Sequence, residues 1–182
     1  MEEVFDIQRP SLHQRYQGMT IGRMTAQKLL RECAAFSALT NAELEKIADS
    51  GLEKEYEAGA TIHQEGESAE ELLLIQEGKV AVQIALPKTA AQASRRLTVD
   101  IVTRNEVLGW SAIIEPYTHT FTAACLQKVK VLSLSGIKLR WLLQDDPKIG
   151  YGVLKGIINV VALKLYDTNY LLASERSLPP KP

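Results

Sequence analysis

The chain has 182 residues and carries 21 basic against 22 acidic side chains, a formal net charge of −1. This near-neutral balance disfavours bulk nucleic-acid binding, which depends on a positive field. The acidic N-terminus does not have the pattern of a secretory signal. No apolar run reaches the roughly 18–20 residues of a membrane helix. Two cysteines are too few for a disulfide framework or an iron–sulfur site. We therefore expect one cytoplasmic domain with extensions, away from membranes, in which Cys33 and Cys125 are free thiols.

Helical patterning follows a polar N-terminal stretch. We expect residues 1–22 to form a loosely held arm, because they are polar and weakly periodic. Apolar residues then recur at three- and four-residue spacing over Leu29–Phe36, which predicts a helix that begins near Thr25. Thr40 and Glu43 have the spacing of a capping box, which predicts a second, short helix.

The period of the apolar residues changes from 3.6 to 2 between residues 52 and 134. This region consists of short β-forming runs separated by Gly, Pro, Asn and Asp. We expect turns at Gly59, Gly66 and Gly78, the last as a short hairpin link, and a polar loop over 87–94. Strands this short and evenly spaced predict an antiparallel β jelly roll, or double-stranded β-helix.

A long helix is predicted at the C-terminal end. Ser135 can cap a short helix, and Asp146-Pro147 can begin another that runs to about residue 174. It carries two apolar lines, of which one should face the strands and the other a second copy of the chain. The first line holds Leu154, Ile157, Ile158, Val161, Leu165 and Leu172, and the second holds Ile149, Val153 and Val160. We expect Leu154, Ile158, Val161 and Leu165 at a homodimer interface, and a disordered tail over 175–182.

Five short motifs follow one another in a fixed order. They are Phe36–Leu44, Tyr56–Gly59, Glu65–Glu67, Leu73–Val80 and Leu108–Ile113. Their order and spacing resemble the cyclic nucleotide-binding domain of the catabolite-activator (Crp/Fnr-like) regulators. The resemblance implies a mainly β domain over 23–174, with N-terminal helices, a jelly roll and a long C-terminal helix, about 147–174, through which the family dimerises.

The segment that begins at Gly109 corresponds to the family's phosphate-binding cassette. A glycine lets backbone approach a ligand closely, and successive amides around Ser111 and Ala112 can bind an anion. In the family, a Glu usually follows the glycine and accepts from the ribose, and an Arg further along pairs with the cyclic phosphate. Here Trp110 follows the glycine, in a Trp-Ser-Ala variant of the cassette, and the stretch Tyr117–Phe121 contains neither Arg nor Lys.

These departures limit the expected ligand binding. Loss of a buried, paired charge costs about 2–5 kcal/mol, so cyclic AMP or cyclic GMP should bind weakly. His119 could supply a counter-charge below its reference pKa of about 6.5, and Thr118 and Thr120 could donate neutral hydrogen bonds. Trp110 could fill the ribose side, stack on a base or plug the core. The cavity should lie between the turn at 109–113 and the strand at 117–124, under the long helix.

The sequence thus predicts a non-catalytic, ligand-sensing regulatory module that acts as a homodimer through an unidentified protein partner. We expect no enzymatic activity, no metal site and no obligatory cofactor, because the three histidines form no ligand motif. Direct DNA binding is not expected, because only eight residues follow Ser174, where the family's transcription factors continue into a helix-turn-helix domain. The alternative is an interaction scaffold that keeps the fold with its pocket filled.

Overall fold

The computed structural model describes residues 23–86 and 96–176, so the predicted arm, the predicted loop and residues 177–182 lie outside the described residues. The helices are α1 (Arg23–Glu32), the 3₁₀ turn η2 (Ala34–Phe36), α2 (Asn41–Ala48), the 3₁₀ turn η3 (Trp110–Ala112), α3 (Gly136–Asp145) and α4 (Pro147–Arg176). The strands are β1 (Gly51–Tyr56), β2 (Thr61–His63), β3 (Glu71–Glu77), β4 (Val80–Ala85), β5 (Arg96–Val102), β6 (Val107–Leu108), β7 (Thr122–Cys125) and β8 (Val129–Ser135).

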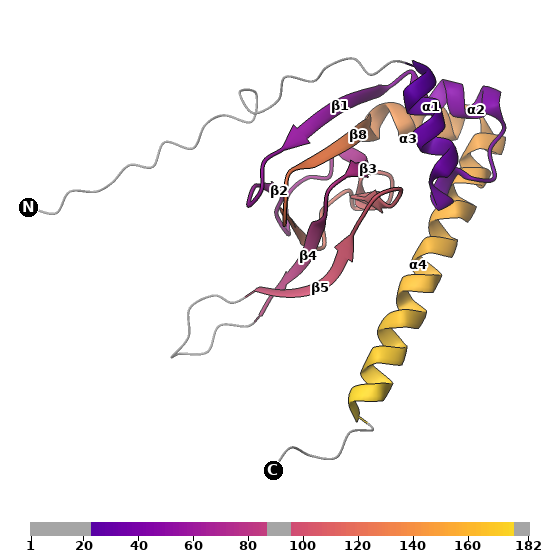
Figure 1. Cartoon of the computed structure of the whole chain (residues 1–182). Coiled ribbons are helices and arrows are strands. Elements are labelled where there is room, and N and C mark those ends of the chain that lie inside the picture. The colour runs from indigo at the N-terminus through magenta and orange to yellow at the C-terminus, as the bar shows by residue number, and fades with distance from the viewer. Residues whose placement is uncertain (1–22, 87–95, 177–182) are drawn as a thin grey trace, which may run out of the picture.

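The predicted antiparallel jelly roll is confirmed. Within the described residues, the strands form two four-stranded sheets, ordered β1-β8-β3-β6 and β2-β7-β4-β5. Every recorded strand pair is antiparallel. The two sheets enclose an apolar cluster that includes Ile75, Val80, Val129 and Val131. Figure 1 shows the strands gathered beside the helices, with β5 at the outer edge of its sheet.

The turn at Gly78 differs from the prediction in its connectivity. Gly59, Gly66 and Gly78 all lie between strands with positive φ, as expected for turns. However, β3 and β4 on either side of Gly78 belong to different sheets, so the link is not a hairpin. A Cβ on Gly78 would lie 2.5 Å from the carbonyl oxygen of Lys128. The chain therefore crosses between the sheets at a point where only glycine fits.

Helix α2 begins at the predicted capping box. The amide of Glu43 donates to the hydroxyl of Thr40 at 3.4 Å, and the amide of Thr40 donates to the Glu43 carboxylate at 2.7 Å. Two otherwise unpaired amides at the helix start are thereby satisfied. Ser135 also stands at its predicted cap position before α3, but its side chain makes no capping bond.

The helices share a second apolar cluster, separate from the one inside the roll. Its fully buried members include Leu30, Phe36, Leu44, Leu139 and Ile149, which come from α1, η2, α2, α3 and α4. Helix α4 begins in this cluster and then extends along one side of the strands (Figure 1). It ends at Arg176, two residues beyond the predicted range.

Candidate functional site

Gly109 forms the turn that the cassette requires. It follows β6, has φ 79°, and is the N-cap of η3. A Cβ at this position would lie 2.8 Å from the carbonyl oxygen of Glu71. The left-handed backbone and the close contact with β3 therefore both require glycine at this position.

The amides after Gly109 divide into two groups. The amide of Ala112 donates to the Gly109 carbonyl at 3.0 Å, so this predicted anion donor is already paired. The amides of Trp110 and Ser111, the first two of η3, donate to no group among the residues that the structure describes. Unpaired amides at the start of a helical turn are able to bind an anion.

The side chains of Trp110 and Ser111 have different surroundings. Trp110 packs against the helical cluster, partly buried, which is the core position among the three considered for it. Ser111 is half-buried. Trp110 therefore connects the cassette to the helical cluster.

His119 lies against the cassette, as a candidate site residue should. Its Cε1 is 3.6 Å from the position of a Gly109 Cβ, and only 7% of the residue is exposed. Thr118 is half-buried and Thr120 is exposed, so the buried residue of the three is His119. Thr118 makes an isolated bridge with Ser68.

The structure adds His63, which sequence reasoning missed. The rings of His63 and His119 are stacked, with centroids 3.6 Å apart and planes 5° from parallel. Neither ring nitrogen of His63 has a hydrogen-bond partner among the described residues. The two histidines are 56 positions apart, and they come together where β2 pairs with β7 and where the backbone of His119 exchanges hydrogen bonds with Gly66 and Glu67. No local sequence signal could have indicated this contact.

Burial changes the expected charge of both histidines. It lowers the pKa of His63 to about 3, with the nearby His119 adding to the effect, and burial also lowers the pKa of His119. Both rings are therefore neutral at pH 7. The pH range in which His119 could supply a counter-charge lies below the value of about 6.5 expected from the sequence.

Arg140 of α3 is the second group that the sequence did not indicate. Its guanidinium donates to the carbonyl oxygen of Ala112 and lies over the ring of Tyr117, 4.2 Å from the centroid. A guanidinium therefore reaches the cassette from another element, where it contacts a carbonyl and a ring. No spacing within residues 109–121 could have pointed to it.

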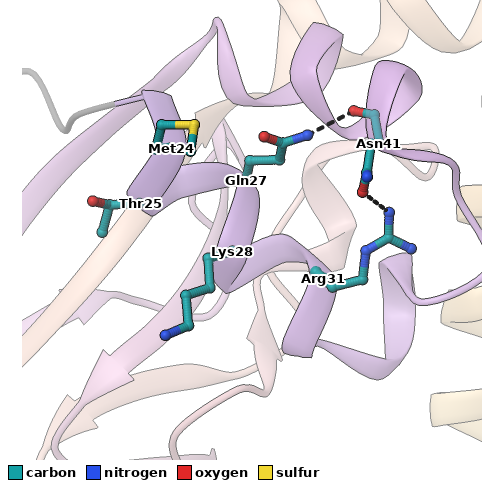
Figure 2. Close-up of a pocket in the computed structure, with 6 residues that line it drawn as sticks. All are labelled: Met24, Thr25, Gln27, Lys28, Arg31 and Asn41. Atoms are coloured by element: carbon teal, nitrogen blue, oxygen red, sulfur yellow. Dashed lines mark hydrogen bonds between the residues drawn. The ribbon is translucent and has the colours of Figure 1, made fainter.

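An open pocket of about 560 Å³ lies on different elements from the predicted cavity. Figure 2 shows Gln27 and Arg31 of α1 pointing toward Asn41 at the start of α2, with hydrogen bonds to its carbonyl and its side-chain oxygen. The lining residues are Met24, Thr25, Gln27, Lys28, Arg31 and Asn41. None of them was expected at the site.

Helix α4 exposes the predicted interface residues. Leu154, Ile158, Val161 and Leu165 are all exposed, Ile158 by 64%. With Tyr151, Thr168 and Leu172, they repeat at alternating spacings of three and four residues, the pattern of a two-helix seam. Ile157, which was expected on this line, is instead buried together with Ile149 and Val153 against the chain's own domain.

Helix α4 meets the length and composition criteria for a membrane span, which the sequence was not expected to do. A run of 18 consecutive residues within Pro147–Ser174 has a mean hydropathy of 1.3, and the helix is long enough to cross a membrane. Length and composition alone are weak grounds for a membrane span, because the core helix of a soluble protein can meet the same criteria. One third of this stretch is buried within the domain.

A family model described as the cyclic nucleotide-binding domain matches residues 53–146. Among curated proteins, no sequence relative matches the chain. The N-terminal domain of a transcriptional regulator from Streptomyces coelicolor A3(2) is similar in structure, with a TM-score of 0.61 and 26% identity, over 79% of this chain and 94% of that one.

Two further solved structures share the fold. A cyclic nucleotide-binding domain from Methylobacillus flagellatus KT has a TM-score of 0.72 and 18% identity, over 91% of this chain and 90% of that one. The regulatory domain of Toxoplasma gondii PKA, crystallised with cAMP, has a TM-score of 0.58 and 18% identity, over 66% of this chain and 45% of that one.

Proposed function

The chain belongs to the cyclic nucleotide-binding domain family, and from that membership we propose that it is a non-catalytic regulatory module that senses a small anionic ligand. Cyclic AMP and cyclic GMP are the first candidates, and binding is weak. The module is a cytoplasmic homodimer and passes its signal to a protein partner. Burial raises the pKa of both Cys33 and Cys125 to about 11, which keeps these thiols protonated and supports a role without nucleophilic chemistry.

The observation that carries the proposal is the backbone of the cassette. Gly109 keeps its left-handed turn, and the amides of Trp110 and Ser111 have no partner in the described part of the chain. A backbone that leaves two donors unpaired is suited to an anionic group. The stretch 117–121 offers no guanidinium to this group, so the affinity is low.

The homodimer is supported by the exposed line on α4. Burying aliphatic side chains such as Leu154, Ile158 and Leu165 against a second copy contributes about 25 cal/mol per Å². The three-four spacing places them on one stripe, as a parallel pair of helices requires. A dimer through this stripe leaves the buried line on the opposite side of α4 undisturbed.

One observation favours the alternative of a ligand-free scaffold. The His119 ring lies beside Gly109 and stacks on His63, so the region expected to hold the ligand already contains side chains. A scaffold would keep this stack under all conditions. A sensor would rearrange it when the anion binds.

A thermal-shift screen tests the proposal. We expect millimolar cyclic AMP or cyclic GMP to raise the melting temperature of the wild type, with 5′-AMP as a control that lacks the cyclic phosphate. At 100 times Kd a ligand stabilises the folded state by about 2.7 kcal/mol. No shift with any cyclic nucleotide would favour the scaffold.

Thr118→Arg restores a guanidinium near its family position. If the backbone cradle binds phosphate, this variant should bind cyclic AMP about 30-fold more tightly than the wild type, because a paired buried charge contributes at least about 2 kcal/mol. Thr118→Gln is the matched control, since it adds length and polarity without charge. Equal affinities of the two variants, both folded, would mean that the cradle does not bind phosphate.

A further inference from the structure

We propose that Arg140 is a positioning residue of the ligand site, one that holds the segment from Gly109 to Tyr117 in its binding geometry from the side of α3. The inference rests on the proposed function, because it concerns the same cassette. The guanidinium contacts this segment at two points, the carbonyl of Ala112 and the ring of Tyr117. We refer to these two contacts as the Arg140 clamp.

The first turn of α3 is built to reach the cassette. Gly136 packs so closely on Ala112 that a Cβ would lie 2.9 Å from its carbonyl oxygen and 3.0 Å from its Cβ. Arg140 follows four residues later, on the same face of the helix. Both residues therefore face the end of η3, and the absence of a side chain at Gly136 lets the helix come near enough for Arg140 to donate.

The segment between the two contacts needs a support of this kind. Ile114, Glu115 and Pro116 are exposed, and Tyr117 has a φ of 57°, an uncommon conformation for a residue with a large side chain. Such backbone persists only where its surroundings hold it. Here the amide of Ala69 donates to the Tyr117 carbonyl at 2.7 Å, and Arg140 covers the ring.

The chemistry of the contacts is specific to arginine. A planar guanidinium can stack on an aromatic ring while one of its five N–H groups donates in the plane, and an ammonium cannot do both. Among the described residues, no carboxylate lies within ion-pair distance of Arg140. The residue therefore acts on the cassette and does not serve as half of a salt bridge.

Hydrogen exchange of the full chain, without ligand, tests the clamp directly. Within residues 110–117, Arg140→Gln should speed exchange of the hydrogen-bonded amides of Ala112, Ile113, Ile114 and Tyr117 about 10-fold or more, through loss of a charged hydrogen bond and a cation–π contact, while exchange in β3 and β8 stays unchanged. Lys138→Gln, an exposed change on the same helix, is the matched control and should leave 110–117 unchanged. Unchanged exchange over 110–117 in Arg140→Gln would overturn the proposal, as would faster exchange throughout the domain.

Binding of cyclic AMP, measured by calorimetry, tests the positioning role. Arg140→Gln and Arg140→Lys should both weaken binding about 10-fold, because Lys keeps the charge but loses the planar contact. Tyr117→Phe keeps the ring and should bind like the wild type, whereas Tyr117→Leu should match Arg140→Gln. Full affinity in Arg140→Lys or in Tyr117→Leu would overturn the role. If the wild type binds no cyclic AMP, the proposed function fails, and the clamp then stands or falls on the exchange result.

Discussion

Helix α4 and the cassette depart from the ordinary distribution of side chains in opposite ways. The second half of α4 exposes large apolar residues, among them Leu163, Leu165 and Tyr166. The cassette region buries polar groups, among them the unpaired ring nitrogens of His63. Soluble domains usually bury their apolar residues and satisfy their buried polar groups. These departures are what the proposed function would explain, with a second copy proposed at α4 and a ligand proposed at the cassette.

The largest expected effect concerns the exposed stripe of α4. Val161→Glu should dissociate the homodimer, because an uncompensated charge in a buried seam costs about 3–5 kcal/mol. This is more than 100-fold in the dimer dissociation constant. Sedimentation equilibrium of the wild type and the variant at micromolar concentration measures it.

The neighbouring Asn159 provides the control for that experiment. It is exposed and lies off the three-four spacing, so Asn159→Glu should leave the dimer intact. Equal dissociation by both variants would indicate a general charge effect. A wild type that is monomeric at micromolar concentration would contradict the proposed homodimer.

An effect of intermediate size is expected at the buried histidines. The folded-state pKa of His63 is about 3, below the unfolded value of about 6.5, so the unfolded chain binds a proton as the pH falls and the folded chain does not. Stability is therefore complete above pH 6.5 and decreases below it. His63 alone should account for a loss of about 2 kcal/mol in the free energy of unfolding between pH 7 and pH 5.

Urea unfolding across this pH range checks the prediction. His63→Phe keeps an aromatic ring beside His119 but cannot titrate, so its stability should decrease less than that of the wild type. The chosen range stays above the ordinary pKa values of the carboxylates. Identical pH dependence in both proteins would show that His63 is not held neutral in the folded state.

The sequence predicted some features of α4 and of the cassette and missed others. The helix of 147–174 and its line of apolar residues follow from apolar periodicity, which is a local signal. Apolar periodicity does not explain its glycines, since a Cβ on Gly156 would lie 2.0 Å from the Ala35 carbonyl oxygen. Such a close approach depends on η2, which is distant in the chain, and periodicity within α4 carries no information about it.

At the cassette, the sequence predicted the turn and missed its surroundings. The turn at 109–113 was predicted from one motif, because a glycine turn is encoded locally. His63 and Arg140 come from other elements, and they reach the site through contacts that are distant in the chain, between β2 and the segment before β7 and between α3 and η3. The link at Gly78 was misassigned for the same reason, since a short connection does not reveal which sheet the next strand joins.

The smallest expected effect concerns the ion pairs that connect α4 to the jelly roll. Lys164 donates to Asp100 of β5 at 2.5 Å and lies 3.4 Å from Glu106, across a partly exposed surface. Lys164→Met should therefore cost only about 0.5–1 kcal/mol in the free energy of unfolding.

The effect should be local and is best measured by hydrogen exchange. In the Val161→Glu background, where no second copy holds α4, Lys164→Met should speed amide exchange over residues 161–172. Lys155→Met, which removes an exposed charge elsewhere on α4, should not do so. Unchanged exchange in the Lys164 variant would mean that the ion pairs do not fix the second half of the helix.

The most direct test of the central claim is a calorimetric titration of cyclic AMP into the wild-type chain at pH 7. The cassette has a glycine turn and two amides without partners among the described residues, while residues 117–121 contain neither Arg nor Lys. We predict one site per chain, with a dissociation constant in the micromolar range or weaker. Nanomolar affinity, or no detectable heat at millimolar cyclic AMP, would contradict the account.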